Sequence, residues 1–574
     1  MQHSIRLFNT ITRSKELFHP IAPPRVTFYN CGPTVYDVFH VGNARNFVFA
    51  DTLRRWLAFR GYDVVFVQNL TDVDDKIIKR ANEEGLSSDE VAQRNTELYF
   101  RYADRLGVRR ATIHPKATEH IALMIAMIER LIARGHAYES DGDVFFSVQS
   151  YHEYGRLSRK NLEEMLEGER VDDQIRQRKR SAADFALWKA AKPGEPAWPS
   201  PWGHGRPGWH IECSAMSIHH LGETIDIHSG GADLAFPHHE NEIAQSCCST
   251  GREFVHTWVH NGFIVMAQEG NDAPTTDAPA TVDNFSGEAA RAKVSKSTMT
   301  EEQKSLFNID KALARFGPVA LRYFLVSAHY RSPLVFSVGH VQDAGRRAER
   351  LLRALEAARV VLAAASAHAP ATAPAGSPQA KLLEQFADRM DDDLNTAQAL
   401  AVVSEALTSI NQARTAAERP DAPSEIHADL AIWVAVFQQM LDVLGLLDAA
   451  AQEQALAAAA ADADTPAREA LVNLLLEQRA TARAAKVWAL SDLLRDRLSA
   501  LGIAVKDTPQ GATWSLAAAT ALPPFDVLMG LLIEARTEAR KAKAWTVADA
   551  IRDALTAQGI ALEDGPSGTT WRHA

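Results

Sequence analysis

The feature that most constrains the fold is a strand–loop–helix pattern close to the N-terminus. An apolar run, Val26 to Asn30, is typical of a short buried strand, and the loop after it holds Cys31, His40 and Gly42. Apolar residues at helical spacing then continue to Gly61, a residue type that is common just past a helix C-terminus. This order is typical of the phosphate-facing start of an open parallel sheet, although an ordinary connecting turn would show the same pattern.

Length and composition define the general class of protein. The chain has 574 residues, enough for several domains of about 100–200 residues each, and its 46% hydrophobic and 23% charged residues are ordinary for a globular protein. Four cysteines are too few for a disulfide framework, and no run of about 18 apolar residues occurs. We therefore expect a cytoplasmic protein with no membrane association. The net charge of -11 argues against bulk attraction to nucleic acid, but it does not exclude local contacts.

A second apolar run, Val64 to Leu70, is followed by Thr71 and three aspartates. If this run is a parallel strand, Thr71 and Asp72 lie at its carboxyl end, where ligands of doubly wound sheets bind. Asp72, Asp74 and Asp75 could together bind a metal ion. A helix N-terminal turn, with acids at the positive end of the helix dipole, is the more common arrangement and is favoured.

The densest group of polar and small residues lies between Trp209 and Gln245. A predicted strand in this segment ends at Gly230 and Gly231, where the backbone can lie flat against a ligand. Asp233 follows at a position suited to accept hydrogen bonds from ribose hydroxyls.

Four possible metal ligands are spread along the chain. His238 and Glu242 are four residues apart in a predicted helix and so share one face, while Cys213 lies upstream and Cys31 lies in the opening loop. Two thiolates, an imidazole and a carboxylate would make a plausible zinc site. The two cysteines are far apart in the sequence and form no CxxC motif, so spacing alone leaves buried free thiols and helix-cap acids as the alternative.

A short basic segment, KVSKS (Lys293 to Ser297), could hold phosphates with Lys293, Lys296 and its two hydroxyls. Lys/Ser loops are also common on ordinary protein surfaces. The residues before it, 267–290, are polar and lack periodicity, which predicts a flexible insertion.

Two of these motifs resemble the signatures of class I aminoacyl-tRNA synthetases: HVGN (His40 to Asn43) and KVSKS. The segments CGPTVYD, NLTDVDDKIIKRA, WPSPWGHGRPGWHIECSAM and GGADLAFPHHENEIAQ resemble the cysteinyl-tRNA synthetases in particular, as do the later LRYFLVSAHYRSPLVFS and MDDDLNTAQAL. The resemblance extends over about residues 4–450 and returns near the C-terminus.

The resemblance implies a ligase that forms an aminoacyl-tRNA bond. L-cysteine and ATP, with Mg²⁺, would give cysteinyl-adenylate, and the cysteinyl group would pass to the 3′-terminal adenosine of tRNA(Cys). We expect a monomer. The implied fold is α/β, with a Rossmann-type doubly wound parallel-sheet catalytic domain and an inserted connective domain. An α-helical bundle and small C-terminal α+β modules follow.

The resemblance also implies roles for individual residues. One Zn²⁺ per chain would be held by Cys31, Cys213, His238 and Glu242, and it would take the substrate thiolate as a further ligand, which separates cysteine from serine. The other implied groups are the catalytic residues His40, Asn43, Lys293 and Lys296; the ATP-binding residues His40, Gly42, Asn43, Gly230, Gly231, Asp233 and Lys296; and the cysteine-binding residues Thr71, Trp209 and His238.

An internal repeat marks the C-terminus without reference to any family. Residues 473–514 align without gaps to residues 530–571, so that Arg479 matches Arg536 and Trp488 matches Trp545. The resulting domain prediction is a catalytic domain split into 1–114 and 206–337, a connective insertion at 115–205, the flexible insertion at 267–290, a helical tRNA-binding bundle at 338–450, an Ala-rich linker at 451–468, and repeat copies at 469–515 and 526–574.

Two alternatives compete with this prediction. A related cysteine ligase that uses an amino-sugar acceptor would keep the zinc and ATP motifs but would lack the helical C-terminal third, which this chain has. A non-catalytic RNA-binding relative would be expected to lose ATP-site residues, whereas His40, Lys296 and the four zinc candidates are all present.

Overall fold

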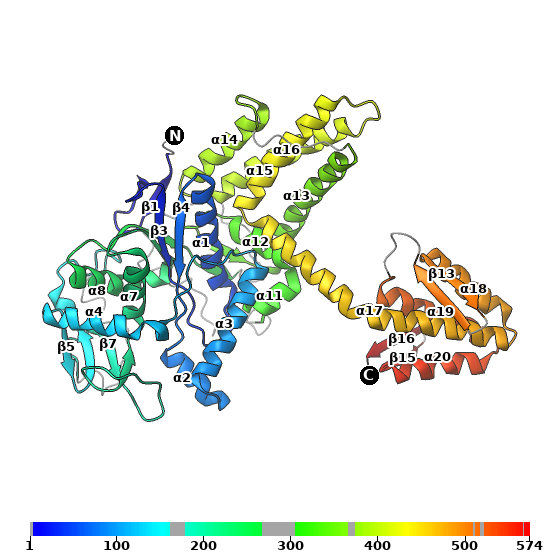
Figure 1. The fold of residues 1–574 in the computed structure, drawn as a ribbon, viewed down its shortest axis with the longest axis horizontal. Coiled ribbons are helices and arrows are strands. Elements are labelled where there is room, and N and C mark those ends of the chain that lie inside the picture. The colour runs from blue at the N-terminus through cyan, green and yellow to red at the C-terminus, as the bar shows by residue number, and fades with distance from the viewer. Residues whose placement is uncertain are drawn as a thin grey trace. The chain divides into compact units, whose positions relative to one another are not determined.

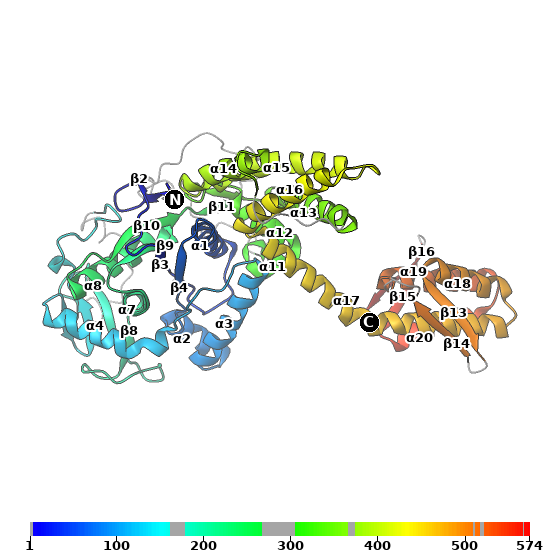
Figure 2. The same cartoon turned by 45° about the horizontal axis from the view of Figure 1, so that its top comes forward.

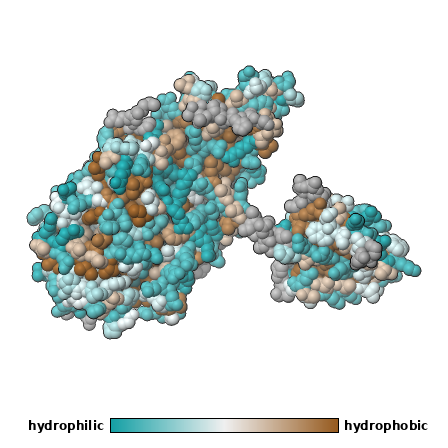
Figure 3. All heavy atoms as spheres, in the orientation of Figure 1, coloured by the Kyte–Doolittle hydropathy of each residue, from teal (hydrophilic) through white to brown (hydrophobic). Residues whose placement is uncertain are grey.

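The computed structural model describes residues 4–160, 178–266, 305–365, 373–508, 511–516, 522–565 and 568–573. The chain divides into two compact units, Met1–Glu453 and Gln454–Ala574. Hydrophilic residues predominate on the face drawn in Figure 3, with apolar residues in scattered patches.

The first unit is built on a parallel sheet of four strands (Figure 1). Their order across the sheet is β10 (Val255–Asn261), β9 (Ile225–Gly231), β3 (Arg25–Asn30) and β4 (Asp63–Gln68). The chain leaves β3 toward β4 on one side and returns to β9 on the other, so the strand order reverses at β3. A reversal of this kind leaves a crevice at the carboxyl ends of the strands, where doubly wound sheets bind ligands. The predicted Rossmann-type α/β fold is confirmed.

Helix α1 (Val41–Phe59) packs along β3 and β4 in both views of the fold (Figures 1 and 2). Its buried face includes Leu53 and Trp56, which join the main apolar core. The helix ends at Arg60, and Gly61 then takes a positive φ of 86°. The strand, loop and helix predicted around Cys31 are therefore present.

Each of the three aspartates after β4 has different partners. Asp72 accepts hydrogen bonds from Thr118, and Asp74 caps α2 (Asp75–Glu84) by accepting from the Lys76 N–H at 2.9 Å. Asp75 pairs with Lys189 at 2.6 Å and with Arg206 at 2.5 Å. The helix-cap interpretation is confirmed, and these acids do not form a common metal site.

The remaining elements of the first unit surround the sheet. In the sequence, an antiparallel sheet of β5 to β8 lies between the two halves of the parallel sheet. Helices α13 to α16 come after both sheets in the sequence, and they lie side by side in Figures 1 and 2. The bounds are β1 (Arg6–Asn9), β2 (Ser14–Leu17), α3 (Ser88–Arg105), η1 (Ala117–His120), α4 (Ile121–Ala133), β5 (Ala137–Ser140), β6 (Asp143–Phe146), η2 (Val148–Ser150), β7 (Phe185–Ala190), β8 (Gly205–Pro207), α7 (Trp209–Leu221), η3 (Ala232–Leu234), η4 (Ala235–His239), α8 (Glu240–Thr250), β11 (Ile264–Met266), α11 (Ile309–Phe316), α12 (Pro318–Val326), β12 (Leu334–Phe336), α13 (Val338–Ala364), α14 (Pro378–Asp391), α15 (Thr396–Ala417) and α16 (Ser424–Val443).

Helix α17 (Leu446–Ala484) contains the boundary between the two units. Residues 451–468, expected as an Ala-rich linker, are helical here, as the high helix propensity of alanine favours. Among the described residues, no helix alone has the length and apolar composition to cross a bilayer. One pair of helical segments, α16 and residues 446–456, has the required length and apolar composition when the two are taken together, but the pair is bent by 86°.

The second unit contains the internal repeat as two copies of the same structure. Each copy has two helices and a β-hairpin: α17, α18 (Trp488–Ala500), β13 (Ile503–Thr508) and β14 (Gly511–Leu516), then α19 (Phe525–Lys541), α20 (Trp545–Ala557), β15 (Ile560–Gly565) and β16 (Gly568–His573). Asp507 accepts from Arg479 and Arg483, and the matching Asp564 accepts from Arg536 and Arg540. Both copies contribute to one apolar core, so neither buries its apolar face alone.

A buried ion pair connects helices of the first unit. Arg322 of α12 is fully buried and donates to the Asp51 carboxylate of α1 at 2.7 Å and to the Leu444 carbonyl at 2.9 Å. Asp51 also accepts from Arg55 at 2.8 Å. Burial lowers the pKa of Arg322, and Asp51 opposes that effect.

We predict that Arg322→Met lowers the free energy of unfolding of the first unit by about 3–5 kcal/mol, because it removes one of the two arginines that pair with the buried Asp51 carboxylate and the donor to the Leu444 carbonyl. Urea unfolding would measure the change. The matched control is Arg353→Met, which removes an arginine with a 76% exposed side chain and should change stability by about 0–1 kcal/mol. Equal effects of the two substitutions would contradict the role assigned to Arg322.

Candidate active site

The candidate site lies at the carboxyl ends of β3 and β9. Cys31 directly follows β3, and its N–H donates to the carbonyl of Ser229 in β9 at 3.2 Å. The side chain of Asn30 donates to the Ser229 hydroxyl at 2.8 Å, and Asn46 of α1 donates to the Cys31 carbonyl at 3.3 Å. These bonds hold the first residue of the loop at the point where the strand order reverses.

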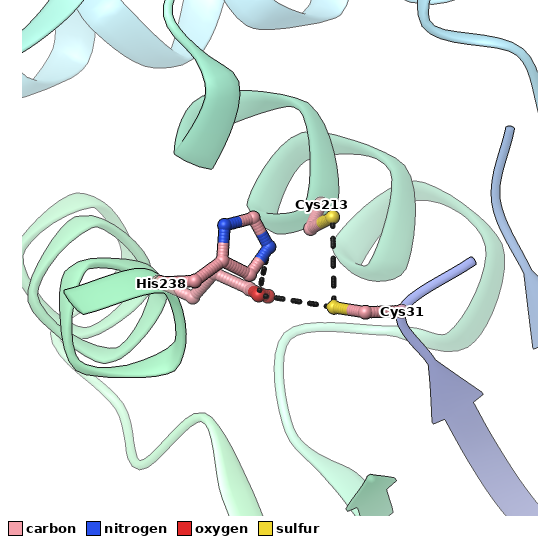
Figure 4. Close-up of side chains that lie close together, drawn as sticks. Cys31, Cys213 and His238 are labelled. Carbon is pink, nitrogen blue, oxygen red and sulfur yellow. Dashed lines mark hydrogen bonds and ion pairs between the residues drawn. The ribbon is translucent and has the colours of Figure 1, made fainter. Parts of the chain in front are cut away.

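The structure brings the four predicted metal ligands together (Figure 4). Cys31 comes from the end of β3, Cys213 from the middle of α7, His238 from the π-helical turn η4 and Glu242 from the first turn of α8. The Cys31 and Cys213 sulfurs are 3.8 Å apart, the Cys31 sulfur lies 3.5 Å from Glu242 Oε1, and His238 Nε2 lies 3.1 Å from the same oxygen. All four side chains are buried, and their ligand atoms lie within 4.8 Å of one another.

The charges in this cluster are those of a cation site. A hydrogen bond from the Cys31 thiol, with the nearby His238, lowers the pKa of Cys213 to about 6, although burial opposes the shift. Burial would raise the pKa of Glu242, but His228 and His238 hold it at about 2. Burial would lower the pKa of His238, but Cys213 and Glu242 raise it to about 10. At neutral pH a thiolate and a carboxylate therefore face one imidazolium, and negative charge is in excess among these residues.

A second histidine group lies against the first and was not predicted from the sequence. His228 Nε2 lies 2.9 Å from Glu242 Oε2, His239 Nε2 lies 3.3 Å from the Cys31 sulfur, and His239 Nδ1 lies 2.7 Å from His260 Nε2. Cys31, His228, His239 and Glu242 thus make an overlapping set of possible ligands. The position of His228 near the carboxyl end of a predicted strand was the available signal.

Gly230 makes room for this histidine group. A Cβ atom at Gly230 would lie 2.7 Å from the His239 ring, closer than real Cβ contacts allow. The glycine was predicted to let a nucleotide approach; in this structure it lets the His239 ring lie against β9. Gly231 follows in the same strand, and Asp233 is exposed in η3.

One predicted cysteine-binding residue packs against the metal-ligand cluster, and another lies beside the opening loop. Trp209 begins α7, and its ring centroid lies 4.3 Å from that of His238. Thr71 is buried, and its N–H donates to the Pro33 carbonyl of the opening loop at 3.1 Å.

The HVGN motif forms the N-terminus of α1. His40 Nδ1 accepts from the Asn43 N–H, and Asn43 Oδ1 accepts from the His40 N–H, each at 3.2 Å. The His40 ring stacks on Phe307 at 5.0 Å. A Cβ atom at Gly42 would lie 2.9 Å from the His40 ring, so the glycine is needed for this capping arrangement. Lys293, Lys296 and the 267–290 insertion lie outside the described residues.

Three family models match the chain. The class I tRNA synthetase (C) catalytic domain matches residues 17–272, the DALR domain matches 385–448, and the cysteinyl-tRNA ligase anticodon binding domain matches 465–514 and 531–572. With the reversal of strand order at β3 and the helix N-terminus beside it, these matches make the chain a class I aminoacyl-tRNA synthetase, which is a ligase.

Individual relatives are more specific. The cysteine–tRNA ligase of Symbiobacterium thermophilum is 46% identical over 89% of this chain and 99% of its own length, and that of Pelotomaculum thermopropionicum is 45% identical over 89% and 99%. Among solved structures, Mycobacterium tuberculosis methionyl-tRNA synthetase in complex with methionyl-adenylate has a TM-score of 0.48 and 14% identity over 75% of this chain and 93% of that one. This chain belongs to the cysteine–tRNA ligase family, and the resemblance found in its sequence is confirmed.

We predict that Cys31→Ala raises the pKa of Cys213 in the metal-free protein, because it removes the hydrogen bond that most lowers this pKa. The ultraviolet absorbance of thiolate, followed as pH falls, should show one transition near pH 6 in the parent protein. The transition should move to higher pH in Cys31→Ala, disappear in Cys213→Ser and stay unchanged in Cys247→Ser. An unchanged midpoint in Cys31→Ala would show that the Cys31 thiol does not stabilise the thiolate.

Proposed function

We propose that this chain activates L-cysteine with ATP and transfers the cysteinyl group to the 3′-terminal adenosine of tRNA(Cys). The observation that carries the proposal is that the loop leading to the N-terminus of α1 begins with Cys31, a member of the buried two-thiol, imidazole and carboxylate cluster. One end of this region suits a soft cation, and the other suits an anion.

The residues fit a zinc ion. Zinc in proteins is bound by thiolate sulfur, imidazole nitrogen and carboxylate oxygen, usually four of them, and Cys31, Cys213, His238 and Glu242 supply these types in one buried place. The overlapping histidine set has one thiol in place of two, so the first set supplies more thiolate and is the better zinc site. When bound, zinc would supply a soft Lewis acid that takes thiolate in preference to a neutral hydroxyl.

The chain's own side chains would position the substrate. Trp209 packs against His238 of the cluster, and Thr71 bonds to the opening loop. Both would hold the cysteine so that its carboxylate is directed toward the N-terminus of α1. The first step is an in-line attack by that carboxylate on the α-phosphate of ATP, which gives cysteinyl-adenylate and releases pyrophosphate. A ribose hydroxyl of the tRNA then attacks the acyl carbon and releases AMP.

The α1 N-terminus would bind the phosphates. A helix N-terminus carries partial positive charge and unpaired N–H groups, which favour anions. His40 and Asn43 lie at this end, and we propose that Gly230, Gly231 and Asp233 hold the adenosine. Lys293 and Lys296 would add charge to the transition state, together with Mg²⁺ on the ATP.

We predict cysteine-dependent exchange of pyrophosphate into ATP by the zinc-loaded protein, with serine giving no exchange. Cys213→Ser should lower kcat/KM for cysteine at least about 100-fold and reduce the zinc content, because it removes a thiolate ligand. The matched control Cys247→Ser changes a half-buried thiol outside the cluster and should behave like the parent. Absence of exchange in the zinc-loaded parent would refute the proposed function.

We propose further that the duplicated C-terminal unit contacts the tRNA through two tryptophans. Trp488 and Trp545 occupy matching positions of the two copies and are 57% and 56% exposed, among the most exposed large apolar residues that the structure describes. Each lies two residues after a lysine with positive φ, Lys486 at 58° and Lys543 at 57°. An exposed aromatic ring next to a cation can stack on an unpaired base and contact its phosphate.

We predict that Trp488→Ala or Trp545→Ala lowers kcat/KM for tRNA roughly 5- to 150-fold, the effect of losing one stacked base at about 1–3 kcal/mol. Cysteine-dependent pyrophosphate exchange should not change, because it does not require tRNA. Comparing the two variants identifies the copy that contacts the RNA. Substitution is preferable to removal of residues 526–574, which would expose the shared core. An unchanged kcat/KM for tRNA in both variants would contradict the proposed contact.

A further inference from the structure

Three histidines gather outside the active site, between two segments that are distant in the sequence. His120 ends η1, and His219 and His220 lie in the last turn of α7. Their ligand nitrogens lie within 4.8 Å of one another. His120 and His220 are half-buried, and His219 is exposed. We propose that His120, His219 and His220 form a second metal site, for a divalent transition-metal ion of the zinc and nickel type.

The spacing of the nitrogens suits such an ion. His120 Nε2 and His220 Nε2 are 3.0 Å apart. Two nitrogens bound to one tetrahedral zinc at about 2.0–2.1 Å lie about 3.3 Å from each other, so a small ring movement is sufficient. Imidazole is a ligand that Zn²⁺, Ni²⁺ and Cu²⁺ all accept, and three histidines leave further coordination positions open to water from the exposed side.

The tautomer of His120 is fixed in the form that binds a metal. His120 Nδ1 lies 2.7 Å from the Lys116 carbonyl, to which it donates its proton. The lone pair is therefore on Nε2, which faces His220. A metal ligand of this kind commonly donates its other N–H to a carbonyl, which also fixes the ring orientation. Without a metal, His220 Nε2–H donates to His120; for Nε2 to bind an ion, His220 takes the other neutral tautomer, with its proton on Nδ1.

The surroundings favour a cation. His219 and His220 lie in the last turn of α7, at the end of the helix where its dipole carries partial negative charge. A protonated histidine cluster would repel itself, whereas a neutral one presents lone pairs.

An ion at this site would connect two segments that border the active site. Helix α7 carries Trp209 and Cys213. The segment before η1 pairs with the chain just after β4 through the Lys116–Leu70 bridge, and Asp72 accepts from the Thr118 N–H at 3.0 Å. The metal would therefore fix the end of α7 to the segment that pairs with the chain leading to Thr71. Its role would be structural rather than catalytic.

Calorimetric titration with Ni²⁺ of the tag-free chain, loaded with only one zinc ion per chain, tests the proposal. We expect one Ni²⁺ per chain without release of zinc, and an increase in the Tm of the first unit. His120→Gln and His220→Gln, which lie on different elements, should each weaken Ni²⁺ binding at least about 10-fold and remove the increase in Tm. His256→Gln, a histidine outside the cluster with a 42% exposed side chain, is the matched control and should bind like the parent.

Zinc content and cysteine-dependent pyrophosphate exchange distinguish this site from the active site. Both should be unchanged in His120→Gln, whereas Cys213→Ser should lose them and keep Ni²⁺ binding. The proposal is overturned if the parent binds no Ni²⁺, if Ni²⁺ binds only as zinc is released, or if both histidine variants bind Ni²⁺ as tightly as His256→Gln. If one variant unfolds, Ni²⁺ binding by the other variant, whose substitution lies on a separate element, still tests the proposal.

Discussion

The arrangement of the catalytic unit depends on one buried carboxylate. Glu242 has no exposed side-chain surface, and a buried carboxylate is stable only when it is paired and hydrogen-bonded. Its partners come from three other elements: Cys31 at the end of β3, His228 in β9 and His238 in η4. The sheet must therefore place β9 beside β3, and η4 must follow β9 closely. A shift of one residue in either strand would move Cys31 or His228 to the opposite face of the sheet and leave the charge without a partner.

Under the proposed function, the same constraint would bring the reacting groups close together. The loop from Cys31 to His40 begins at the metal-ligand cluster and ends at the N-terminus of α1, so one short connection joins the proposed cation site to the proposed phosphate site. Asn30 and Asn46 hold its first residue from the side of the sheet and from the side of the helix. Few side chains beyond those of the loop are then needed to bring a carboxylate near a phosphate.

Much of this could be predicted from the sequence, because local patterns have local causes. The apolar run before Cys31 and the glycine after α1 fix one strand and one helix, and a four-residue spacing places His238 near Glu242 even though α8 begins only at Glu240. The meeting of Cys31 with Cys213 has no local cause. It follows from the packing of α7 against β3 and β4, which a single sequence does not reveal, so only the resemblance to a family indicated it. His228 and His239 were missed for the same reason: their partners lie on other elements.

The internal repeat shows which contacts a copied module must keep. Both copies retain a carboxylate, Asp507 or Asp564, that accepts from two arginines, because this ion-pair group connects the hairpin to the first helix of its copy. They differ at the hairpin tryptophan. Trp514 donates to Asn473 at 2.9 Å, but Gly530 stands at the matching position of the second copy, where Trp571 instead packs on Phe525 at 5.5 Å. The shared core and the ion pairs are thus needed for folding in both copies, whereas the tryptophan environments have diverged. A difference in RNA contact between the copies would therefore come from these surfaces rather than from the scaffold that holds them.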